Sequence, residues 1–323
     1  MRELVRRLLG AAGYEVRRIS QHEPKWSDTV EDYYPLQPKP RQGHGLPPHA
    51  GLRDVLERDR DTYKSVLGSI ASAHSILHGI PQEPTAGRPD VPFWRNHWFS
   101  VLDAAALVSF LCARRPARYM EIGSGHSTRF ASYAIRAAGL PTHITSIDPH
   151  PRAEIDTLCD SVLRQPLENC SLAVFDTLER GDILFFDGSH RVFQNSDVTV
   201  FFLEVIPRLK PGVLVHIHDI FLPDDYPPAW KSRLYSEQYM LAAMLACGSP
   251  PFRVVLPNHF VCADPGLSAL VRNVFAGEDG RPDIPFLYPI EGHTIAGVSF
   301  WVETVSARGD PTVGDVHEHH RQV

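Results

Sequence analysis

The side chains best suited to chemistry gather in two short segments, Asp187 to His190 and His216 to Asp219. A histidine can accept a proton from an oxygen or nitrogen nucleophile near neutral pH. A divalent cation bound to that nucleophile would instead lower its pKa. We predict that His190, His218 and Asp219 are catalytic and that His216 is a hydrogen-bonded core residue. The choice between a histidine base, a metal and a purely structural role for these histidines stays open.

A glycine-rich turn lies earlier in the chain, within residues 118–128, Arg-Tyr-Met-Glu-Ile-Gly-Ser-Gly-His-Ser-Thr. A short apolar run ends in Glu121, passes through Gly123 and Gly125, and opens into a helical pattern over 127–138. This pattern predicts a strand, a tight turn and a helix whose N-terminal amides face a ligand. Glycine suits such a turn because it tolerates φ > 0 and because a missing Cβ lets a ligand lie on the backbone.

An acidic residue, Asp148, follows the next apolar run and lies 23 residues past Gly125. At this position a carboxylate can accept hydrogen bonds from the hydroxyl groups of a ribose. The alternative is a turn residue, since Asp148 precedes Pro149 and Asp-Pro favours turns. The strand position and the glycine turn together favour the ribose role.

Strands and helices alternate over most of the chain. The predicted strands are 119–122, 143–147, 162–165, 182–186, 213–217, 252–256 and 298–303, and the predicted helices are 52–77, 98–112, 127–138, 197–209 and 237–246. This alternation predicts an α/β fold with a doubly wound, Rossmann-like, seven-stranded and mostly parallel sheet, covered by helices on both faces. Ligands of such sheets bind outside the carboxyl ends of the strands, where Glu121, Asp148, Asp187 and Asp219 stand.

The flanking segments differ in composition from this core. Residues 1–20 have the pattern of a basic amphipathic helix, and residues 23–48 are proline-rich, typical of a linker or lid. We predict a helical and Pro-rich N-terminal extension over 1–92, a catalytic domain over 93–305 with an inserted loop at 264–296, and a disordered tail over 306–323.

Composition limits the classes of function. A net charge of −6 with no basic stripe argues against a nucleic-acid partner. No apolar run is long enough to span a membrane, and the five cysteines form no C-x-x-C pair. These features predict a cytoplasmic protein with reduced thiols and a small-molecule partner, and they leave a homo-oligomer open.

Residues 93–303 resemble a class I S-adenosylmethionine-dependent methyltransferase. The matching segments are Glu-Ile-Gly-Ser-Gly at 121–125 with Ser-Thr at 127–128, Gly-Asp-Ile-Leu-Phe-Phe-Asp-Gly-Ser-His at 181–190, Pro-Arg-Leu-Lys-Pro-Gly-Val-Leu-Val-His-Ile-His-Asp-Ile-Phe-Leu-Pro at 207–223, and Glu-Gln-Tyr at 237–239. The resemblance implies S-adenosylmethionine as cofactor. The cofactor-binding residues it implies are Glu121, Gly123, Ser124, Gly125, Ser127, Asp148, Asp187 and, beside the adenine, Gln165.

A nicotinamide-dependent oxidoreductase is the alternative for the same fold. Its G-x-G-x-x-G fingerprint needs a third glycine where this chain has Thr128, because a pyrophosphate must approach the backbone there. S-adenosylmethionine has no phosphate and does not need that glycine. The missing glycine therefore favours the methyltransferase.

The aspartates and histidines within residues 187–190 and 216–219 are similar to the metal site of the cation-dependent catechol and caffeoyl-CoA O-methyltransferases. Asp187 matches an aspartate that ends strand four in that family, and His218-Asp219 fall on its Asp-Asn pair. His190 stands where the family has lysine. The resemblance thus implies a metal site at Asp187, His218 and Asp219, for Mg²⁺, Mn²⁺, Fe²⁺ or Zn²⁺.

The sequence predicts O-methylation of a sugar or natural product more than N- or C-methylation. Residues 221–230 and the linker at 24–48 would contact the acceptor, with Tyr226, Trp230 and Tyr239 either stacking on it or packing beneath the loop. Two other functions remain as alternatives. One is a non-catalytic S-adenosylmethionine-binding or assembly protein. The other is a metal-dependent hydrolase, for which the chain lacks an H-E-x-x-H run or a serine nucleophile elbow.

Overall fold

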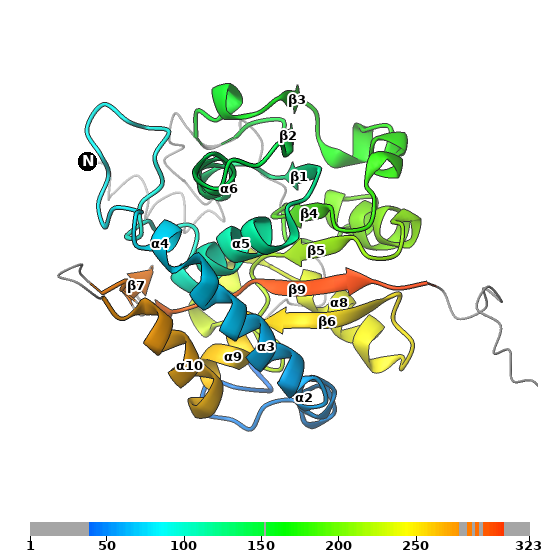
Figure 1. The fold of residues 1–323 in the computed structure, drawn as a ribbon. Coiled ribbons are helices and arrows are strands. Elements are labelled where there is room, and N and C mark those ends of the chain that lie inside the picture. Colours follow the sequence, from blue (N-terminus) through cyan, green and yellow to red (C-terminus); the bar gives the residue numbers. More distant parts are fainter. Residues whose placement is uncertain (1–38, 152, 278–282, 286–287, 291–292, 307–323) are drawn as a thin grey trace, which may run out of the picture. The chain divides into compact units, whose positions relative to one another are not determined.

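Seven strands form one sheet in the order β3-β2-β1-β4-β5-β9-β6, in a computed structural model that describes residues 39–151, 153–277, 283–285, 288–290 and 293–306 (Figure 1). The strands are β1 (Arg118–Ile122), β2 (His143–Ile147), β3 (Ser161–Leu163), β4 (Ile183–Phe186), β5 (Leu214–Ile217), β6 (Phe252–Pro257) and β9 (Phe300–Thr304). Strands β1 to β5 are mutually parallel, and β9 runs antiparallel between β5 and β6. The predicted doubly wound, mostly parallel sheet is confirmed.

The strand order reverses between β1 and β4. From β1 the chain moves outward to β2 and β3, and then returns to place β4 on the other side of β1. In open α/β sheets the helices before and after such a reversal diverge, which leaves a crevice at the carboxyl ends of the two strands. The glycine turn follows β1, and Asp187 follows β4, so both sequence motifs meet at this crevice.

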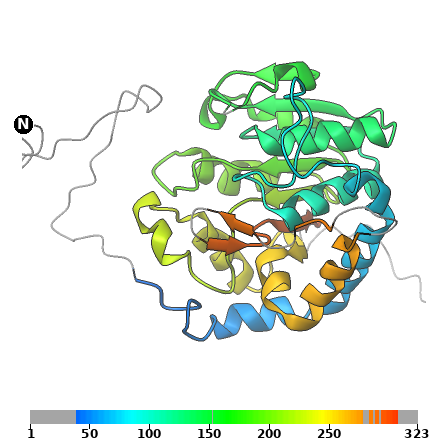
Figure 2. The same ribbon diagram turned by 90° about the vertical axis from the view of Figure 1, so that its left-hand side faces the viewer.

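The central strands are buried on both faces because helical segments cover each side of the sheet (Figure 2). All residues of β4 and β5 are buried, as expected of apolar runs such as Ile-Leu-Phe-Phe in a parallel sheet. The main helices are α2 (Ala50–Glu57), α3 (Arg60–Ile70), α4 (His74–Leu77), α5 (Val101–Arg114), α6 (His126–Ala137), α7 (Asp197–Val200), α8 (Glu237–Ala246), α9 (Asn258–Ala263) and α10 (Pro265–Phe275).

Two predicted helices are subdivided. The predicted helix 52–77 is α2, α3, a 3₁₀ turn and α4, and their apolar side chains join the same hydrophobic core as α5 and the sheet. The predicted helix 197–209 is α7, then a π-helical segment over Phe201–Val205 and a 3₁₀ turn over Ile206–Arg208. Pro207 accounts for part of this change, since it has no backbone N–H to continue an α-helix.

The prediction of an inserted loop at 264–296 is wrong for residues 265–275, which form a helix. Helix α10 occupies Pro265–Phe275 with Asp264 as its N-cap, and the Asp264 carboxylate accepts the backbone N–H of Leu267. Asp followed by Pro is a common helix start, because proline needs no hydrogen-bond partner in the first turn. Further on, β7 (Tyr288–Ile290) pairs with β8 (His293–Ile295) in a separate hairpin.

Some predictions fall outside the described residues. These are the amphipathic helix at 1–20, most of the linker at 23–48, and nearly all of the tail at 306–323. The described residues from Pro40 onward belong to one compact unit. Among the described residues, the helices are all too short or too polar to cross a lipid bilayer.

Candidate functional site

The turn after β1 requires glycine at one of its two positions. Gly123 has φ +77°, and a Cβ added there would lie 1.8 Å from the carbonyl oxygen of Asp187. Glycine thus lets the end of β1 approach the end of β4. Gly125 has φ 174°, an extended conformation open to any residue, and a Cβ there would meet no atom within 4 Å. The expected positive φ is confirmed at Gly123, while Gly125 leaves free space above the turn.

Glu121 lies beneath this turn and is fully buried. Its carboxylate accepts hydrogen bonds from the Thr128 hydroxyl (2.5 Å) and the Tyr119 hydroxyl (3.2 Å). Thr128 in turn accepts the backbone N–H of Gly125 at 3.0 Å. Burial raises the pKa of Glu121 to about 7, against the opposing effect of hydrogen bonds from Ser127, Thr128 and Tyr119. Glu121 therefore braces the turn from below, and its predicted contact with a cofactor stays a prediction.

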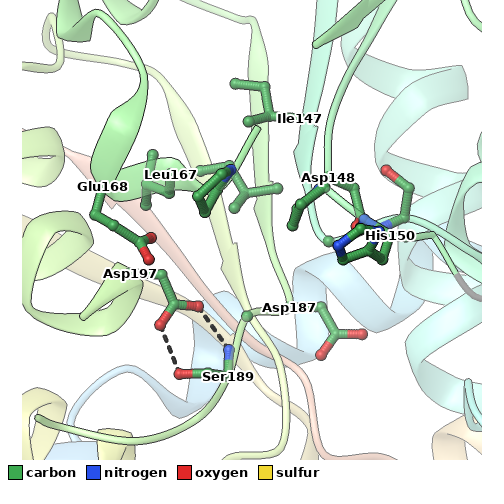
Figure 3. A pocket seen from close by; sticks show the side chains of 14 residues that line it. Ile147, Asp148, His150, Leu167, Glu168, Asp187, Ser189 and Asp197 are labelled. Atoms are coloured by element: carbon green, nitrogen blue, oxygen red, sulfur yellow. Dashed lines mark hydrogen bonds between the residues drawn. The ribbon is translucent and has the colours of Figure 1, made fainter. Parts of the chain in front are cut away.

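A cavity of about 340 Å³ opens above the ends of β1, β2 and β4 (Figure 3). Its lining residues are Ile122, Gly123, Ser124, Ile147, Asp148, Pro149, His150, Pro166, Leu167, Glu168, Asp187, Gly188, Ser189 and Asp197. The lining contains four carboxylates and no lysine or arginine. This wall favours a neutral or cationic ligand over one that carries phosphate groups.

Asp148 serves the turn and also faces the cavity. Its carboxylate accepts the backbone N–H of Ser124 at 2.8 Å and that of His150 at 2.7 Å. Each carboxylate oxygen has a second lone pair, so these two bonds leave acceptor capacity for hydroxyl groups in the cavity. The two interpretations of Asp148, turn residue and ribose ligand, are thus compatible.

A smaller cavity of about 70 Å³ adjoins the first on the side of α6. Its lining residues are Trp98, Phe99, Ser124, Gly125, His126, Ser127, Ala153 and Asp187. Ser124 and Asp187 line both cavities. Six of the eight predicted cofactor residues therefore face one cavity or both. Glu121 and Gln165 line neither, although Pro166 directly after Gln165 does.

The predicted catalytic residues come together next to Asp187. The Nε2 atom of His190 lies 3.1 Å from Asp187 Oδ1 and 3.6 Å from Asp219 Oδ2. His218 Nε2 lies 3.7 Å from Asp219 Oδ1. Asp187 thus belongs both to the cavity wall and to this cluster. The turns after β4 and β5 bring these side chains together because the two strands are parallel neighbours.

His190 is buried, and its ring contacts carboxylates on both of its nitrogen atoms. Burial alone would lower the pKa of His190, but Glu237, Asp187 and Asp219 together raise that pKa well above its usual value. Glu237, whose Oε1 contacts His190 Nδ1, is itself fully buried. Burial raises the pKa of Glu237 to about 7, and the neighbouring His190 opposes this rise.

Glu237 was not among the predicted site residues. The Glu-Gln-Tyr motif at 237–239 is part of the family resemblance, but no role follows from it. An acidic residue in the first turn of a helix is usually explained by the helix dipole, so its type carried no further signal. Only the folded chain brings Glu237 to His190, 47 residues away.

The two histidines of β5 and its end differ in environment. His216 is fully buried, donates or accepts a 2.6 Å hydrogen bond with the Ser299 hydroxyl, and stacks on Phe185 at 3.7 Å. Burial and the nearby His218 lower the pKa of His216 well below its usual value. The prediction of a hydrogen-bonded core histidine is confirmed. Burial also lowers the pKa of His218, but Asp187, Asp219 and Asp103 outweigh it and leave that pKa raised.

The same geometry bears on the predicted metal site. Within the described part of the chain, no group of three or more His, Cys, Asp or Glu side chains is arranged to hold a metal ion. The Nε2 atom of His190 contacts the carboxylates of both Asp187 and Asp219, which are two of the three side chains predicted to hold the metal. The site at Asp187, His218 and Asp219 stays a prediction.

Parts of the chain are similar in sequence to known proteins. Residues 120–220, less than half of the chain, match the family model described as a methyltransferase domain. A protein of Archaeoglobus fulgidus, described as uncharacterized, is 26% identical over 164 residues, which cover 44% of this chain and 74% of that protein.

Two solved structures are similar at low identity. The O-methyltransferase TomG from Streptomyces achromogenes, in complex with S-adenosylmethionine, is 14% identical with a TM-score of 0.35, over 75% of this chain and 89% of TomG. The S-adenosylhomocysteine-bound methyltransferase PaMTH1 from Podospora anserina is 14% identical with a TM-score of 0.37, over 82% of this chain and 100% of PaMTH1.

The matched segment runs from β1 to just past β5. It contains the strand-order reversal, the glycine turn and the predicted catalytic residues. The strand order and the antiparallel β9, taken with this match, define a Rossmann-like methyltransferase fold.

Proposed function

We propose that this protein transfers a methyl group from S-adenosylmethionine to an oxygen atom of a small molecule, with His190 as general base. The observation that carries the proposal is the position of Asp187. Its carboxylate lines the cavity above the glycine turn and lies 3.1 Å from His190. A cofactor in that cavity would place its reactive end beside the group that can take up a proton.

The cavity walls suit the parts of this cofactor. Asp148 has acceptor capacity for the ribose hydroxyls, and Pro166 and Leu167 offer an apolar surface for the adenine. The amino acid part would extend along Ser124 and Ser127 into the smaller cavity. The acidic lining favours the positive sulfonium, whereas it opposes the pyrophosphate of a dinucleotide. When bound, S-adenosylmethionine supplies an electrophilic methyl group.

His190 would act on the acceptor. Methyl transfer is a direct displacement, so the protein must orient the acceptor oxygen and take its proton. A positive sulfonium near Asp187 opposes the protonated form of His190, so cofactor binding favours a neutral imidazole. Nε2 can then accept the hydroxyl proton, and the carboxylates of Asp187 and Asp219 stabilise the resulting imidazolium. A hydroxyl acceptor needs this help more than a neutral amine, because its lone pair is a weak nucleophile until the proton leaves.

Aromatic residues beside His190 would form the acceptor side. The ring of Tyr235 lies 4.3 Å from the ring of His190. Trp230 is buried in a small cluster with Phe221, which supports packing beneath the loop, whereas Tyr239 keeps 49% of its surface exposed. We infer that Tyr239 and Tyr235 contact a sugar or aromatic acceptor.

Isothermal titration calorimetry with S-adenosylmethionine and S-adenosylhomocysteine tests the proposal. We expect one site per chain, and at least about a tenfold weaker affinity for Asp148→Ala, because a ribose contact to a carboxylate is worth more than 1.4 kcal/mol. The matched control is Asp176→Ala, which should leave the affinity unchanged because the Asp176 carboxylate bonds the Arg208 side chain and lines neither cavity. Absence of binding by the unmodified protein would contradict the proposal.

A further inference from the structure

The first residues of α8 hold His190 by its backbone. The His190 carbonyl oxygen accepts the N–H groups of Ser236 (2.8 Å) and Glu237 (3.3 Å), and the Ser236 hydroxyl accepts the N–H of Val192 at 2.9 Å. His190 itself has φ +61°, a left-handed conformation that side chains with a Cβ rarely adopt. These three bonds therefore maintain a backbone conformation that the sequence alone disfavours.

The side chain of Glu237 holds the ring of the same residue. Glu237 Oε1 contacts His190 Nδ1, and Glu237 is completely buried. Its other oxygen, Oε2, has no hydrogen-bond partner among the described residues. A buried carboxylate is costly unless it is paired, and here the pairing is with His190. Glu237 lines neither cavity, so it would not touch the cofactor.

We propose that Glu237 is a positioning residue, which fixes the His190 ring by accepting its Nδ1–H and so directs Nε2 toward Asp187 and the reacting oxygen. This inference rests on the proposed function for its purpose, but its geometry can be tested separately. With Nδ1 engaged by Glu237, the tautomer of neutral His190 has its lone pair on Nε2. That is the form a general base needs on the side of the cavity.

The next two residues of the motif bind elsewhere. Gln238 accepts the N–H of Phe221 at 2.9 Å, and the Tyr239 hydroxyl donates to Asp225 Oδ1 at 3.0 Å. These bonds tie α8 to the loop after β5 and do not reach the His190 ring. Tyr239 therefore provides a matched control from the same helix turn.

Proton NMR of protein labelled with ¹⁵N-histidine tests the inference without an acceptor. We expect a downfield imidazole N–H signal, assigned by its loss in His190→Asn, that disappears in Glu237→Leu and persists in Tyr239→Phe. Glu237→Gln keeps an acceptor oxygen but loses the charge, so its signal should move upfield because the hydrogen bond weakens. This isosteric variant gives a result even if Glu237→Leu fails to fold.

The inference is overturned if the unmodified protein lacks the downfield signal, or if the signal is unchanged in Glu237→Gln or in a folded Glu237→Leu. Titration of S-adenosylmethionine into Glu237→Gln should give an affinity within about twofold of the unmodified protein, and a tenfold loss would overturn a role confined to His190. A failure of the unmodified protein to bind S-adenosylmethionine would count against the proposed function and leave the NMR result to decide on Glu237.

Discussion

Two residues that the sequence predicts to be catalytic, His190 and Asp219, have left-handed backbones with φ +61° and +54°. Neither is glycine, and their side chains lie 3.6 Å apart. Such conformations are unfavourable for residues with a Cβ, and they persist only where the surrounding structure imposes them. At His190 this conformation is held by the backbone N–H groups of Ser236 and Glu237, which bond the His190 carbonyl oxygen at the start of α8. Strain at two facing residues supports a functional origin for the cluster.

Glu121 gives a pH-dependent contribution to stability. Its pKa rises from 4.5 to about 7 on folding, so the folded state binds a proton more tightly between these values. The contribution is fully present below pH 4.5 and is lost as the pH rises through 7. Glu121→Gln stays neutral at every pH. Its free energy of unfolding should therefore rise by about 3 kcal/mol relative to that of the unmodified protein as the pH goes from 4.5 to 8.

Urea unfolding at several pH values measures this difference. Glu204→Gln is the control, because it makes the same substitution at an exposed position. The free energies of unfolding of Glu121→Gln and of the unmodified protein should therefore differ more at pH 8 than at pH 4.5. A difference that stays constant between these pH values would contradict the raised pKa of Glu121.

At the scale of elements, the turn after β1 shows which features the sequence could predict. The strand, turn and helix, and the acidic residues at strand ends, follow from apolar runs and glycines. The different roles of Gly123 and Gly125 could not be predicted, because only the pairing of β1 with β4 brings Asp187 against Gly123. Glu237 was missed for the same reason, since no local pattern links it to His190.

Substitution by alanine should change the stability of the fold much more at Gly123 than at Gly125. Gly123→Ala places a Cβ against the Asp187 carbonyl at positive φ and should destabilise the fold by about 3 kcal/mol or more. Gly125→Ala meets open space at an extended φ and should change stability by less than about 0.5 kcal/mol.

Cofactor affinity completes this comparison. The methyl group of Gly125→Ala would occupy space above the turn, so binding of S-adenosylmethionine should weaken at least about tenfold although the fold is intact. Equal affinity for Gly125→Ala and the unmodified protein would show that the cofactor does not lie on this turn. Thermal unfolding and calorimetry on the same samples provide both measurements.

In the described unit as a whole, residues 41–77 pack onto the sheet domain. Residues of α2, α3 and α4 share the core with α5, and residues 41–49 bond the loop after β5. Asp225 Oδ2 accepts the N–H groups of Arg41 (2.5 Å) and Gln42 (2.9 Å), and His49 donates its N–H to the carbonyl of Pro223 at 3.0 Å. The Pro-rich composition indicated a linker or lid but gave no sign of this attachment.

Removal of the Asp225 carboxylate should release this attachment locally. In Asp225→Ala, amide hydrogen exchange over residues 40–49 should accelerate by about tenfold or more, because two backbone N–H groups lose a charged acceptor. Exchange in β1, β4 and β5 should not change, since their hydrogen bonds are independent of Asp225. Asp224→Ala is the adjacent control, because its carboxylate bonds His259 rather than residues 41–42. Unchanged exchange over 40–49 would contradict this assignment.

A crystal structure of the protein with S-adenosylhomocysteine would show whether the cofactor lies beside His190. We expect the ribose hydroxyls to bond the Asp148 carboxylate and the thioether sulfur to face Asp187 and His190. We also expect the amino acid part to lie along Ser124 and Ser127. A ligand bound on another edge of the sheet, or one in this cavity with its sulfur turned away from His190, would contradict the proposed function.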